Sequence, residues 1–410
     1  MVWYQIHSLG AAGVAGTNPD VGATGPFSDG FSRLQPWLDH VADLGCHGVL
    51  LTPIFVSSTH GYDTVDPFRI DQRLGDESAF QSFVEACHQR GLALLLDGVF
   101  NHVGRQFGPF CDVLARGRDS EYASWFRIDF EQAGEDGDPF RYRSFEGHRE
   151  LVALNHGNPA VLDWAADVAN HWLDRGVDGW RFDVAYALPR PFLAELAGRI
   201  RAGHPDAFLF GEMIHGDYAG FVSESGLDSV TQYELYKAIW SSLNDGNFFE
   251  LAWALERHQR FSAGFVPMTF IGNHDVTRIA SQLSNPAHIA QALALLCTLP
   301  GRPGVYYGDE FGWTGVKEAR AGGDDAMRPP LPASASPADE RQAAVLDLHR
   351  RLIGLRRERP WLDRATVEMG DLANQRISYS VTDGTRRLTV TLDIGEAAEA
   401  PGWWVSESSS

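Results

Sequence analysis

Two side chains that could do chemistry lie close together in one short segment of the sequence. Arg181 and Asp183 are two residues apart within Gly179–Val184, a segment with the composition of a buried strand. Because residues i and i+2 of a strand share a face, Arg181 is expected to hold the Asp183 carboxyl in its ionised form. An oriented carboxylate at the end of a strand is a candidate nucleophile, although a structural ion pair would leave the same pattern.

Further carboxylates and histidines stand where other predicted strands end. They follow short apolar runs of the kind that form buried parallel strands. The carboxyl ends of parallel strands in a barrel lie at one mouth, so these side chains are expected to meet there. They are Asp97, His102, Glu212, His274 and Asp275.

Three carboxylates that converge in this way are suited to glycoside hydrolysis. A retaining mechanism needs one ionised carboxylate to attack the anomeric carbon and one protonated acid to assist the leaving oxygen. Asp183 suits the first role. Glu212 suits the second, because its apolar sequence neighbours Phe210 and Met213 would raise the pKa of its carboxyl.

A third anion and neutral imidazoles would stabilise the charged, flattened transition state of this reaction. Asp275, His274 and His102 could supply these groups. In the alternative interpretation, the Asn-His-Asp and Asn-His segments that contain them are only turn and capping residues.

The rest of the sequence predicts the elements that would hold these residues. A helix is predicted over 31–44, and Ser78 and Gln81 resemble a capping box at the start of another. Asn158 and Pro159 form a good N-cap and first position for a third. Strands that alternate with helices indicate an α/β fold, specifically a (β/α)8 TIM barrel, whose active site lies at the carboxyl ends of the strands. The eight predicted strands are residues 2–7, 47–53, 92–96, 179–184, 207–212, 229–232, 265–271 and 304–307.

Two regions depart from this alternation. Residues 103–156 are rich in Gly, Asp, Arg and aromatic residues and form too long a connection for an ordinary loop, which indicates an inserted domain. After Pro360, alternating segments over 376–381 and 388–392 indicate antiparallel strands, and the Ser-rich end is expected to fray. The predicted domains are residues 1–102 with 157–358 for the barrel, 103–156 for the insertion and 359–410 for a small C-terminal antiparallel β domain.

Composition excludes several classes of partner. The formal net charge of −20 opposes binding to nucleic acid or to an anionic membrane, so a neutral substrate is expected. The four cysteines form no C-x-x-C motif and are expected to be reduced thiols. Neither a signal peptide nor an apolar run of membrane-spanning length is evident, which predicts a cytoplasmic protein.

Four motifs, in order along the chain, resemble the conserved regions of the α-amylase family of glycoside hydrolases (glycoside hydrolase family 13). They are Asp97–His102, Gly179–Val184, Gly211-Glu212 and Phe270–Asp275. This resemblance implies a barrel called domain A, an inserted domain B and a C-terminal domain C. It implies that Asp183 is the nucleophile, Glu212 the acid/base and Asp275 the stabiliser of the transition state.

The same resemblance implies a set of residues that bind the substrate. Tyr62, within the family-like segment Gly61–Asp66, would stack on the sugar at the cleavage site. Asp325 and Arg328 of the loop Gly322–Arg328 would contact sugars beyond the cleavage point. The alternative is that these two residues form only a surface ion pair. The full set is Tyr62, Asp97, His102, Arg181, His274, Asp325 and Arg328.

Details of these motifs resemble the neopullulanase and cyclomaltodextrinase group. Ala185–Ala187 stands where many starch-degrading members carry a Lys-His pair that helps to bind calcium. We therefore expect no cofactor and no metal. A structural calcium ion is an unsupported option, although Asn101, which belongs to the family's calcium site, is retained. Relatives in this group carry an extra N-terminal domain that completes a dimer's active site, and this chain starts at the first strand, so both a monomer and a homodimer remain open.

The leading interpretation is a retaining α-glucoside hydrolase of short or cyclic maltooligosaccharides, of the cyclodextrin or cyclic maltosyl-maltose type. It would cleave α-1,4 bonds, with α-1,6 bonds as a second candidate linkage. A transglycosylase, isomerase or sugar phosphorylase could use the same covalent intermediate. A non-catalytic barrel, like the family-related heavy chains of transporters, fits less well because Asp183, Glu212 and Asp275 are all present.

Overall fold

Eight parallel strands form the centre of the computed structural model, which describes residues 1–22, 28–320, 322–395 and 402–409. Their spatial order is β13-β12-β11-β5-β2-β1-β15-β14, and a parallel bridge between Thr231 and Met268 joins the two outer strands. The sheet therefore closes into a barrel, and the predicted TIM barrel is confirmed. The strands are β1 (Trp3–Ile6), β2 (Gly48–Leu51), β5 (Ala93–Gly98), β11 (Gly179–Phe182), β12 (Phe208–Gly211), β13 (Ser229–Val230), β14 (Met268–Phe270) and β15 (Arg302–Tyr306).

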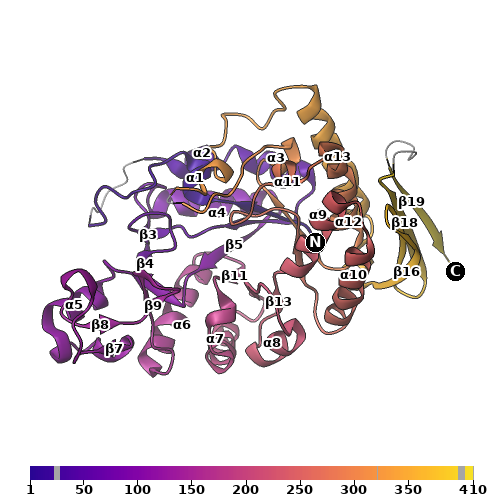
Figure 1. Ribbon diagram of the computed structural model, residues 1–410. Coiled ribbons are helices and arrows are strands. Elements are labelled where there is room, and N and C mark those ends of the chain that lie inside the picture. The colour runs from indigo at the N-terminus through magenta and orange to yellow at the C-terminus, as the bar shows by residue number, and fades with distance from the viewer. Residues whose placement is uncertain (23–27, 321, 396–401, 410) are drawn as a thin grey trace.

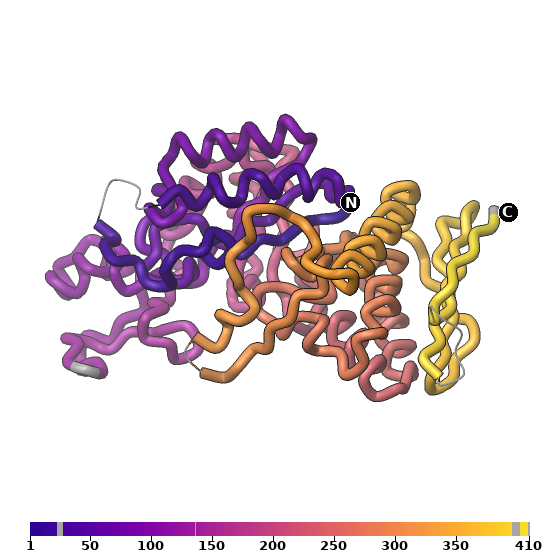
Figure 2. Tube along the Cα trace, turned by 90° about the horizontal axis from the view of Figure 1, so that it is seen from above, coloured from indigo at the N-terminus to yellow at the C-terminus, as the bar shows by residue number. Residues whose placement is uncertain are grey.

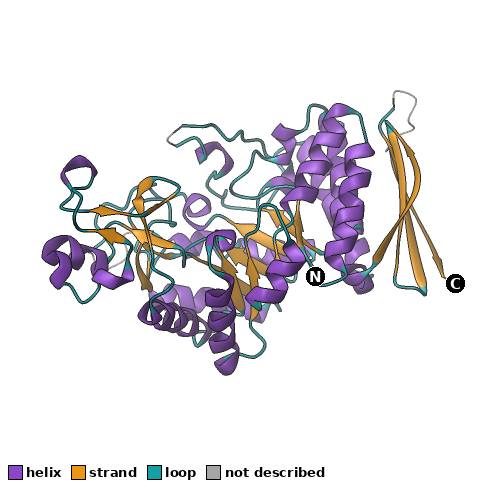
Figure 3. Ribbon diagram, turned by 60° about the horizontal axis from the view of Figure 1, so that its bottom comes forward, coloured by secondary structure: helices purple, strands orange, loops and turns teal. Residues whose placement is uncertain are grey.

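Alternation along each strand divides the barrel's apolar residues between two cores. Trp3, Leu50, Leu95, Phe210 and Met268 pack together inside the barrel. Their sequence neighbours point outward to a ring of helices, which Figure 3 shows around the orange strands. The main helices are α3 (Trp37–Leu44), α4 (Glu77–Gln89), α6 (Pro159–Leu173), α7 (Arg190–Gly203), α8 (Tyr218–Ser225), α9 (Tyr233–Asp245), α10 (Phe249–Ser262), α12 (Ile289–Thr298) and α13 (Glu340–Arg357).

Two predictions about helices differ from the structure. The helix predicted over 31–44 is divided into α2 (Gly30–Leu34) and α3, because Pro36, which lacks an N–H, stands between them. The capping box at Ser78 is wrong, since Asp76 caps α4 by accepting the Ala79 N–H. The predicted cap of α6 at Asn158 is confirmed.

The segment between β5 and α6 contains small sheets of its own. Strands β6 (His102–Gly104), β10 (His148–Ala153) and β9 (Ser144–Phe145) form one antiparallel sheet, with helix α5 (Gly108–Arg116) beside it at the left of Figure 1. A second sheet pairs β7 (Ile128–Asp129) with β8 (Arg141–Tyr142). This arrangement matches the predicted insertion, while its exact limits, 103–156, stay a prediction.

A four-stranded antiparallel sheet forms the C-terminal part of the chain. Its strands are β16 (Thr366–Ala373), β17 (Arg376–Thr382), β18 (Arg386–Asp393) and β19 (Trp403–Ser409). Figure 2 shows this sheet in yellow at the opposite end of the molecule from the insertion. The Tyr379 hydroxyl anchors it to α12 through a 2.6 Å hydrogen bond with Thr298 Oγ1. The expectation that the Ser-rich end frays is wrong for residues up to Ser409, because β19 pairs along β18.

Two general expectations concern the cysteines and the absence of a membrane-spanning segment. All four cysteines are free, and only Cys111 is exposed. Among the described residues, the helices are too short or too polar to cross a lipid bilayer.

Candidate active site

Arg181 lies at the centre of a cluster of carboxylates at the carboxyl end of the barrel. It is only 3% exposed. Its Nη1 lies 2.5 Å from Asp97 Oδ2 and 3.2 Å from Asp183 Oδ1. Its Nη2 lies 3.0 Å from Glu212 Oε1. One guanidinium group therefore contacts carboxylates from three successive regions of the barrel.

The register of neighbouring strands brings these groups together. Arg181 of β11 is paired with Asp97 of β5, so both side chains leave the sheet at the same level. Asp183 follows β11, and its N–H still donates to Gly98 O at the end of β5. Glu212 directly follows β12. Parallel pairing thus converts three distant sequence positions into one site.

The backbone turn after Asp183 supplies a further contact. Val184 has φ of 40° and ψ of 42°, in the left-handed region that a β-branched residue rarely adopts. In this conformation its N–H donates to Glu212 Oε2 at 3.0 Å. The strained turn therefore directs a donor at a carboxylate of the cluster.

Glu212 is bound by polar groups rather than by its apolar sequence neighbours. It is 5% exposed, and besides Arg181 and the Val184 N–H it accepts a 3.2 Å hydrogen bond from the Tyr233 hydroxyl. Asn273 Nδ2 donates in turn to the Tyr233 oxygen at 2.9 Å. The expected apolar environment of Glu212 is therefore wrong, because side chains from other strands reach its carboxylate.

The net shift in the pKa of Asp183 is opposite to the expected one, although Arg181 acts in the expected direction. Burial raises the pKa of the Asp183 carboxyl well above its usual range, and the negative charges of Glu212, Asp97 and Asp275 add to this. Arg181 lowers the same pKa but does not outweigh these effects. Burial is the main reason. In addition, one cation is shared among several carboxylates, whereas the sequence suggested an exclusive pair.

Asp275 has the opposite electrostatic environment. Its Oδ2 lies 2.9 Å from His274 Nε2, and its Oδ1 lies 3.2 Å from Arg328 Nη2. Burial would raise the pKa of Asp275, but His274 and Arg328 together lower it below its usual range. Gln5 Nε2 donates to His274 Nδ1 at 3.0 Å, which leaves the hydrogen on Nε2. This nitrogen lies near both Asp275 Oδ2 and, at 2.5 Å, the Tyr62 hydroxyl oxygen.

Tyr62 and His102 connect the carboxylate cluster to the insertion. The Tyr62 hydroxyl donates to Asp97 Oδ2 at 3.0 Å, and its ring stacks in parallel on His274 at 5.6 Å. His102 Nε2 lies 3.2 Å from the Tyr62 carbonyl oxygen, and the His102 ring stacks on Phe145 of β9. Burial lowers the pKa of His102 to about 4, so this imidazole is neutral at pH 7.

Asp325 is the exception among the predicted residues. It is exposed, and its neighbour Asp324 pairs with Arg328 instead, at 3.0 Å. Arg328 also donates to the His274 carbonyl oxygen from Nε and Nη2. The carboxylate that this loop brings to the cluster is therefore Asp324, because the 3-10 turn that starts at Asp325 points that side chain outward.

A sequence profile of the alpha amylase catalytic domain matches residues 34–367. The chain belongs to the α-amylase family of glycoside hydrolases. It is 31% identical to a cyclomaltodextrinase of Geobacillus thermopakistaniensis and 31% identical to neopullulanase 2 of Thermoactinomyces vulgaris, over 98% and 84% of this chain. It spans 70% and 58% of the length of these two relatives.

A solved structure resembles this α-amylase family chain over nearly the full length of both. Cyclic α-maltosyl-(1→6)-maltose hydrolase of Arthrobacter globiformis superposes with a TM-score of 0.83 at 27% identity, covering 100% of this chain and 98% of that one. The resemblance to the family and to its neopullulanase and cyclomaltodextrinase relatives, inferred from short motifs, is confirmed.

Whether this chain could bind a structural calcium ion can be judged from the residues at the family's calcium site. Asn101, the retained member of that signature, donates through Nδ2 to His102 Nδ1 at 3.2 Å. Ala185–Ala187 forms a 3-10 turn without side-chain oxygen ligands apart from the Tyr186 hydroxyl. Within the described part of the chain, no group of three His, Cys, Asp or Glu residues is arranged to hold a metal ion. These donors do not fit a calcium site, which needs many oxygen ligands.

Sequence reasoning missed four residues that complete this α-amylase family site. Tyr233 and Asn273 support Glu212, Gln5 orients His274, and Asp324 pairs with Arg328. Three of them stand in or just after a barrel strand, as the predicted residues do. Position at a strand end is therefore a usable signal for Tyr233, Asn273 and Gln5, although the prediction from sequence used it only for carboxylates, histidines and Arg181.

Proposed function

We propose that this chain is a retaining α-glucoside hydrolase that cleaves α-1,4 bonds in short or cyclic maltooligosaccharides through a covalent glycosyl-enzyme intermediate. The observation that carries the proposal is the contact of Asp183 and Glu212 with a single guanidinium group. This contact favours the short carboxylate separation of retaining enzymes over the wider one that admits a water molecule in inverting enzymes.

In the proposed mechanism, Asp183 attacks the anomeric carbon while Glu212 gives its proton to the departing glycosidic oxygen. Glu212 then removes a proton from water, which attacks the same carbon and releases Asp183. The clustering of carboxylates supports the retention of one proton within the site, because three buried carboxyl groups around one cation repel one another. The proposed mechanism places this proton on Glu212 when the substrate is bound. Asp275, kept ionised by His274 and Arg328, would stabilise the positive charge that develops on the sugar.

The substrate-binding roles follow from the same geometry. Tyr62 would present its ring to the apolar face of the sugar at the cleavage site, held by Asp97 and by the neutral His102. His274 and Arg328 would contact sugar hydroxyls near Asp275. We propose Asp324 in place of Asp325 as the carboxylate that accompanies Arg328.

The substrate class can be narrowed by the relatives. The full-length match to a cyclic maltosyl-maltose hydrolase supports that ring as the preferred substrate, with α-1,6 bonds as a second candidate linkage. The test is to incubate the protein with maltotriose, panose, pullulan, β-cyclodextrin and cyclic maltosyl-maltose and to identify the products. Proton NMR during the first turnovers should show the α-anomer of the new reducing end, whereas a β-anomer would overturn the retaining mechanism.

Transfer to another sugar is the second candidate function. A 4-alpha-glucanotransferase of Thermotoga neapolitana is 28% identical over 82% of this chain, and water competes with sugar hydroxyls or phosphate for the same intermediate. Product analysis at high substrate concentration, with and without phosphate, separates the candidates. A predominance of transfer, isomerised or phosphorylated products would replace the hydrolase assignment.

Tyr233→Phe tests the contact that the sequence did not indicate. Removing the hydroxyl deletes a hydrogen bond to Glu212 and leaves Asn273 without its acceptor. We expect kcat to fall about tenfold with little change in KM, since the lost bond orients the acid rather than the substrate. The matched control is Tyr236→Phe, because Tyr236 packs on the same Phe270 ring without contacting Glu212. Equal effects of the two substitutions would remove Tyr233 from the site.

We propose a cytoplasmic protein that acts on a neutral oligosaccharide, without nucleic acid or membrane partners. Four free cysteines and the names of two Bacillus subtilis relatives, both called intracellular maltogenic amylase, support this location. The net charge of −20 supports a neutral substrate. Sedimentation of the purified chain would distinguish a monomer from a homodimer, and both stay open.

A further inference from the structure

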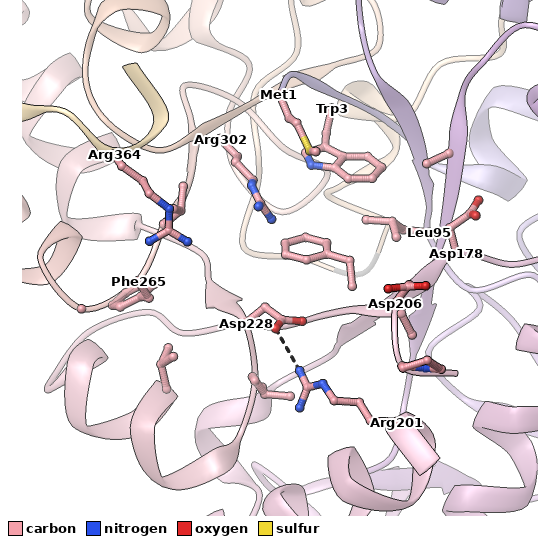
Figure 4. A pocket seen from close by; sticks show the side chains of 18 residues that line it. Met1, Trp3, Leu95, Asp178, Arg201, Asp206, Asp228, Phe265, Arg302 and Arg364 are labelled. Carbon is pink, nitrogen blue, oxygen red and sulfur yellow. Dashed lines mark ion pairs between the residues drawn. The ribbon is translucent and has the colours of Figure 1, made fainter. Parts of the chain in front are cut away.

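A second pocket lies at the opposite mouth of the barrel from the carboxylate cluster. It has a volume of about 600 Å³ and is lined by residues at the amino ends of the strands, including Trp3 of β1, Phe208 of β12 and Arg302 of β15. Figure 4 shows Arg302, Arg364 and Asp206 directed toward its centre. The proposed glycosidase reaction, at the carboxyl ends, assigns no role to this pocket.

Two arginines in this pocket, the partly buried Arg302 and the exposed Arg364, make no direct ion pair among the described residues. Within the described residues, neither a hydrogen bond nor an ion pair holds the side chain of Arg302 or Arg364, and Arg302 Nε is buried without a partner. Figure 4 shows both guanidinium groups entering the pocket from the same side. Burial lowers the pKa of Arg302 and outweighs the opposing charges of Asp363 and Asp228, and the nearby charge of Arg364 lowers this pKa further. Two like charges held together in this way attract an anion placed between them.

The neighbouring carboxylates are already engaged. Asp228 pairs with Arg201 at 2.9 Å, the contact drawn as a dashed line in Figure 4, and it accepts the Leu209 N–H. Asp363 binds both the terminal ammonium group and Arg356. A chain with 54 acidic and 34 basic residues thus leaves these two arginines without a direct ion pair at one cavity, where the anion of a ligand could contact both.

The remaining walls indicate what else such a ligand would carry. Arg302 lies over the Phe208 ring at 4.5 Å, and Phe208 stacks in parallel on Trp3 at 5.9 Å, which forms an apolar wall and fixes the guanidinium. Trp3 is 5% exposed and its Nε1 is buried without an acceptor. Across the pocket, Asp206 is exposed and has no ion pair among the described residues, so it can accept hydrogen bonds from hydroxyl groups.

We propose that this pocket binds a phosphorylated sugar, with the phosphate between Arg302 and Arg364 and the sugar hydroxyls toward Asp206. A volume of about 600 Å³ suits a ligand of that size. A hexose phosphate and a nucleoside monophosphate share this chemistry. The proposal is independent of the proposed glycosidase function, because the two sites lie at opposite ends of the strands.

The test is calorimetric titration of the full chain with glucose 1-phosphate, AMP, inorganic phosphate and glucose at constant ionic strength. Any affinity tag belongs at the carboxyl terminus, since Met1 lines the pocket. We expect one of the two organic phosphates to bind with a Kd below about 1 mM, and inorganic phosphate at least about tenfold more weakly. Tighter binding of glucose 1-phosphate or of AMP shows whether the ligand is a hexose phosphate or a nucleoside monophosphate. Absence of binding by both at about 10 mM overturns the proposal, and inorganic phosphate binding as tightly as either overturns the sugar assignment.

Variants separate this pocket from the active site, which could also bind a sugar phosphate. Arg302→Gln and Arg364→Gln should each weaken binding at least about tenfold. The matched control is Arg201→Gln, because Arg201 lines the same pocket but is paired with Asp228. Its effect should stay below about threefold. Asp206→Asn should weaken glucose 1-phosphate while strengthening inorganic phosphate. Unchanged binding in Arg302→Gln, or an equal loss in Arg201→Gln, would refute the site.

Discussion

Asp183→Asn is expected to lower kcat on the preferred oligosaccharide by at least about four orders of magnitude. An amide cannot form the glycosyl ester, so the first step of the proposed mechanism is lost. The substitution keeps the size of the side chain and leaves Arg181 an oxygen to bind, so the variant should fold. The measurement is initial-rate kinetics, accompanied by circular dichroism to establish that the variant is folded.

The control for this loss is the carboxylate at the other end of β11. Asp178 directly precedes β11, at the amino end of the barrel, where it binds His88 and the Leu94 N–H. Asp178→Asn should change kcat by less than about threefold, because that carboxylate lies at the other mouth of the barrel. Glycosidase activity of Asp183→Asn within about tenfold of wild type would disprove the assignment of the nucleophile.

Arg181→Met is expected to lower the free energy of unfolding by about 3–5 kcal/mol at pH 7, together with nearly all activity. The substitution fills much of the same volume but leaves Asp97, Asp183 and Glu212 without their shared cation. Burial already raises the pKa of Asp97 and of Asp183, and Arg181 lowers both, so its removal raises them further.

This loss should depend on pH in a defined direction. A carboxyl whose pKa is higher in the folded than in the unfolded chain destabilises the fold above the folded pKa, and the penalty vanishes below the unfolded value of about 4. The deficit of Arg181→Met relative to wild type should therefore be largest at pH 7 and shrink as the pH falls toward 4. Urea denaturation across this range measures it.

The matched control for Arg181→Met is Arg201→Met, which removes a half-exposed arginine paired with Asp228 elsewhere on the barrel. That change should cost no more than about 1 kcal/mol. A deficit of Arg181→Met that is constant with pH would show that packing, rather than the charge on Arg181, holds the cluster together.

The sharing of Arg181 has a consequence for the proposed mechanism. Within the cluster, one cation faces three buried carboxyl groups, so ionisation of any two of them gives the group a net negative charge. Such a site is complementary to the positive charge that develops on the sugar ring. Asp275 adds a further anion whose own partners, His274 and Arg328, keep it ionised.

Local patterns in the sequence were sufficient for the barrel and for the main carboxylates. A parallel strand buried on both faces needs a continuous apolar run, and the first polar residue after such a run lies at the catalytic mouth of a barrel. This reasoning located Asp97, Asp183 and Glu212 at the ends of β5, β11 and β12. The N-cap of α6 at Asn158 was equally predictable from the sequence, because it depends only on residues in the same turn.

Only the tertiary structure decided which of these groups contact one another. Arg181 is shared among three carboxylates because the registers of β5, β11 and β12 align, and register is a relation between segments distant in sequence. Burial, together with the other carboxylates that share Arg181, reverses the expected shift in the pKa of Asp183. The choice of Asp324 over Asp325 likewise depends on how one loop folds back onto Arg328. A residue's type and its place in an element are encoded locally, whereas its electrostatic partners are set by the packing of the whole barrel.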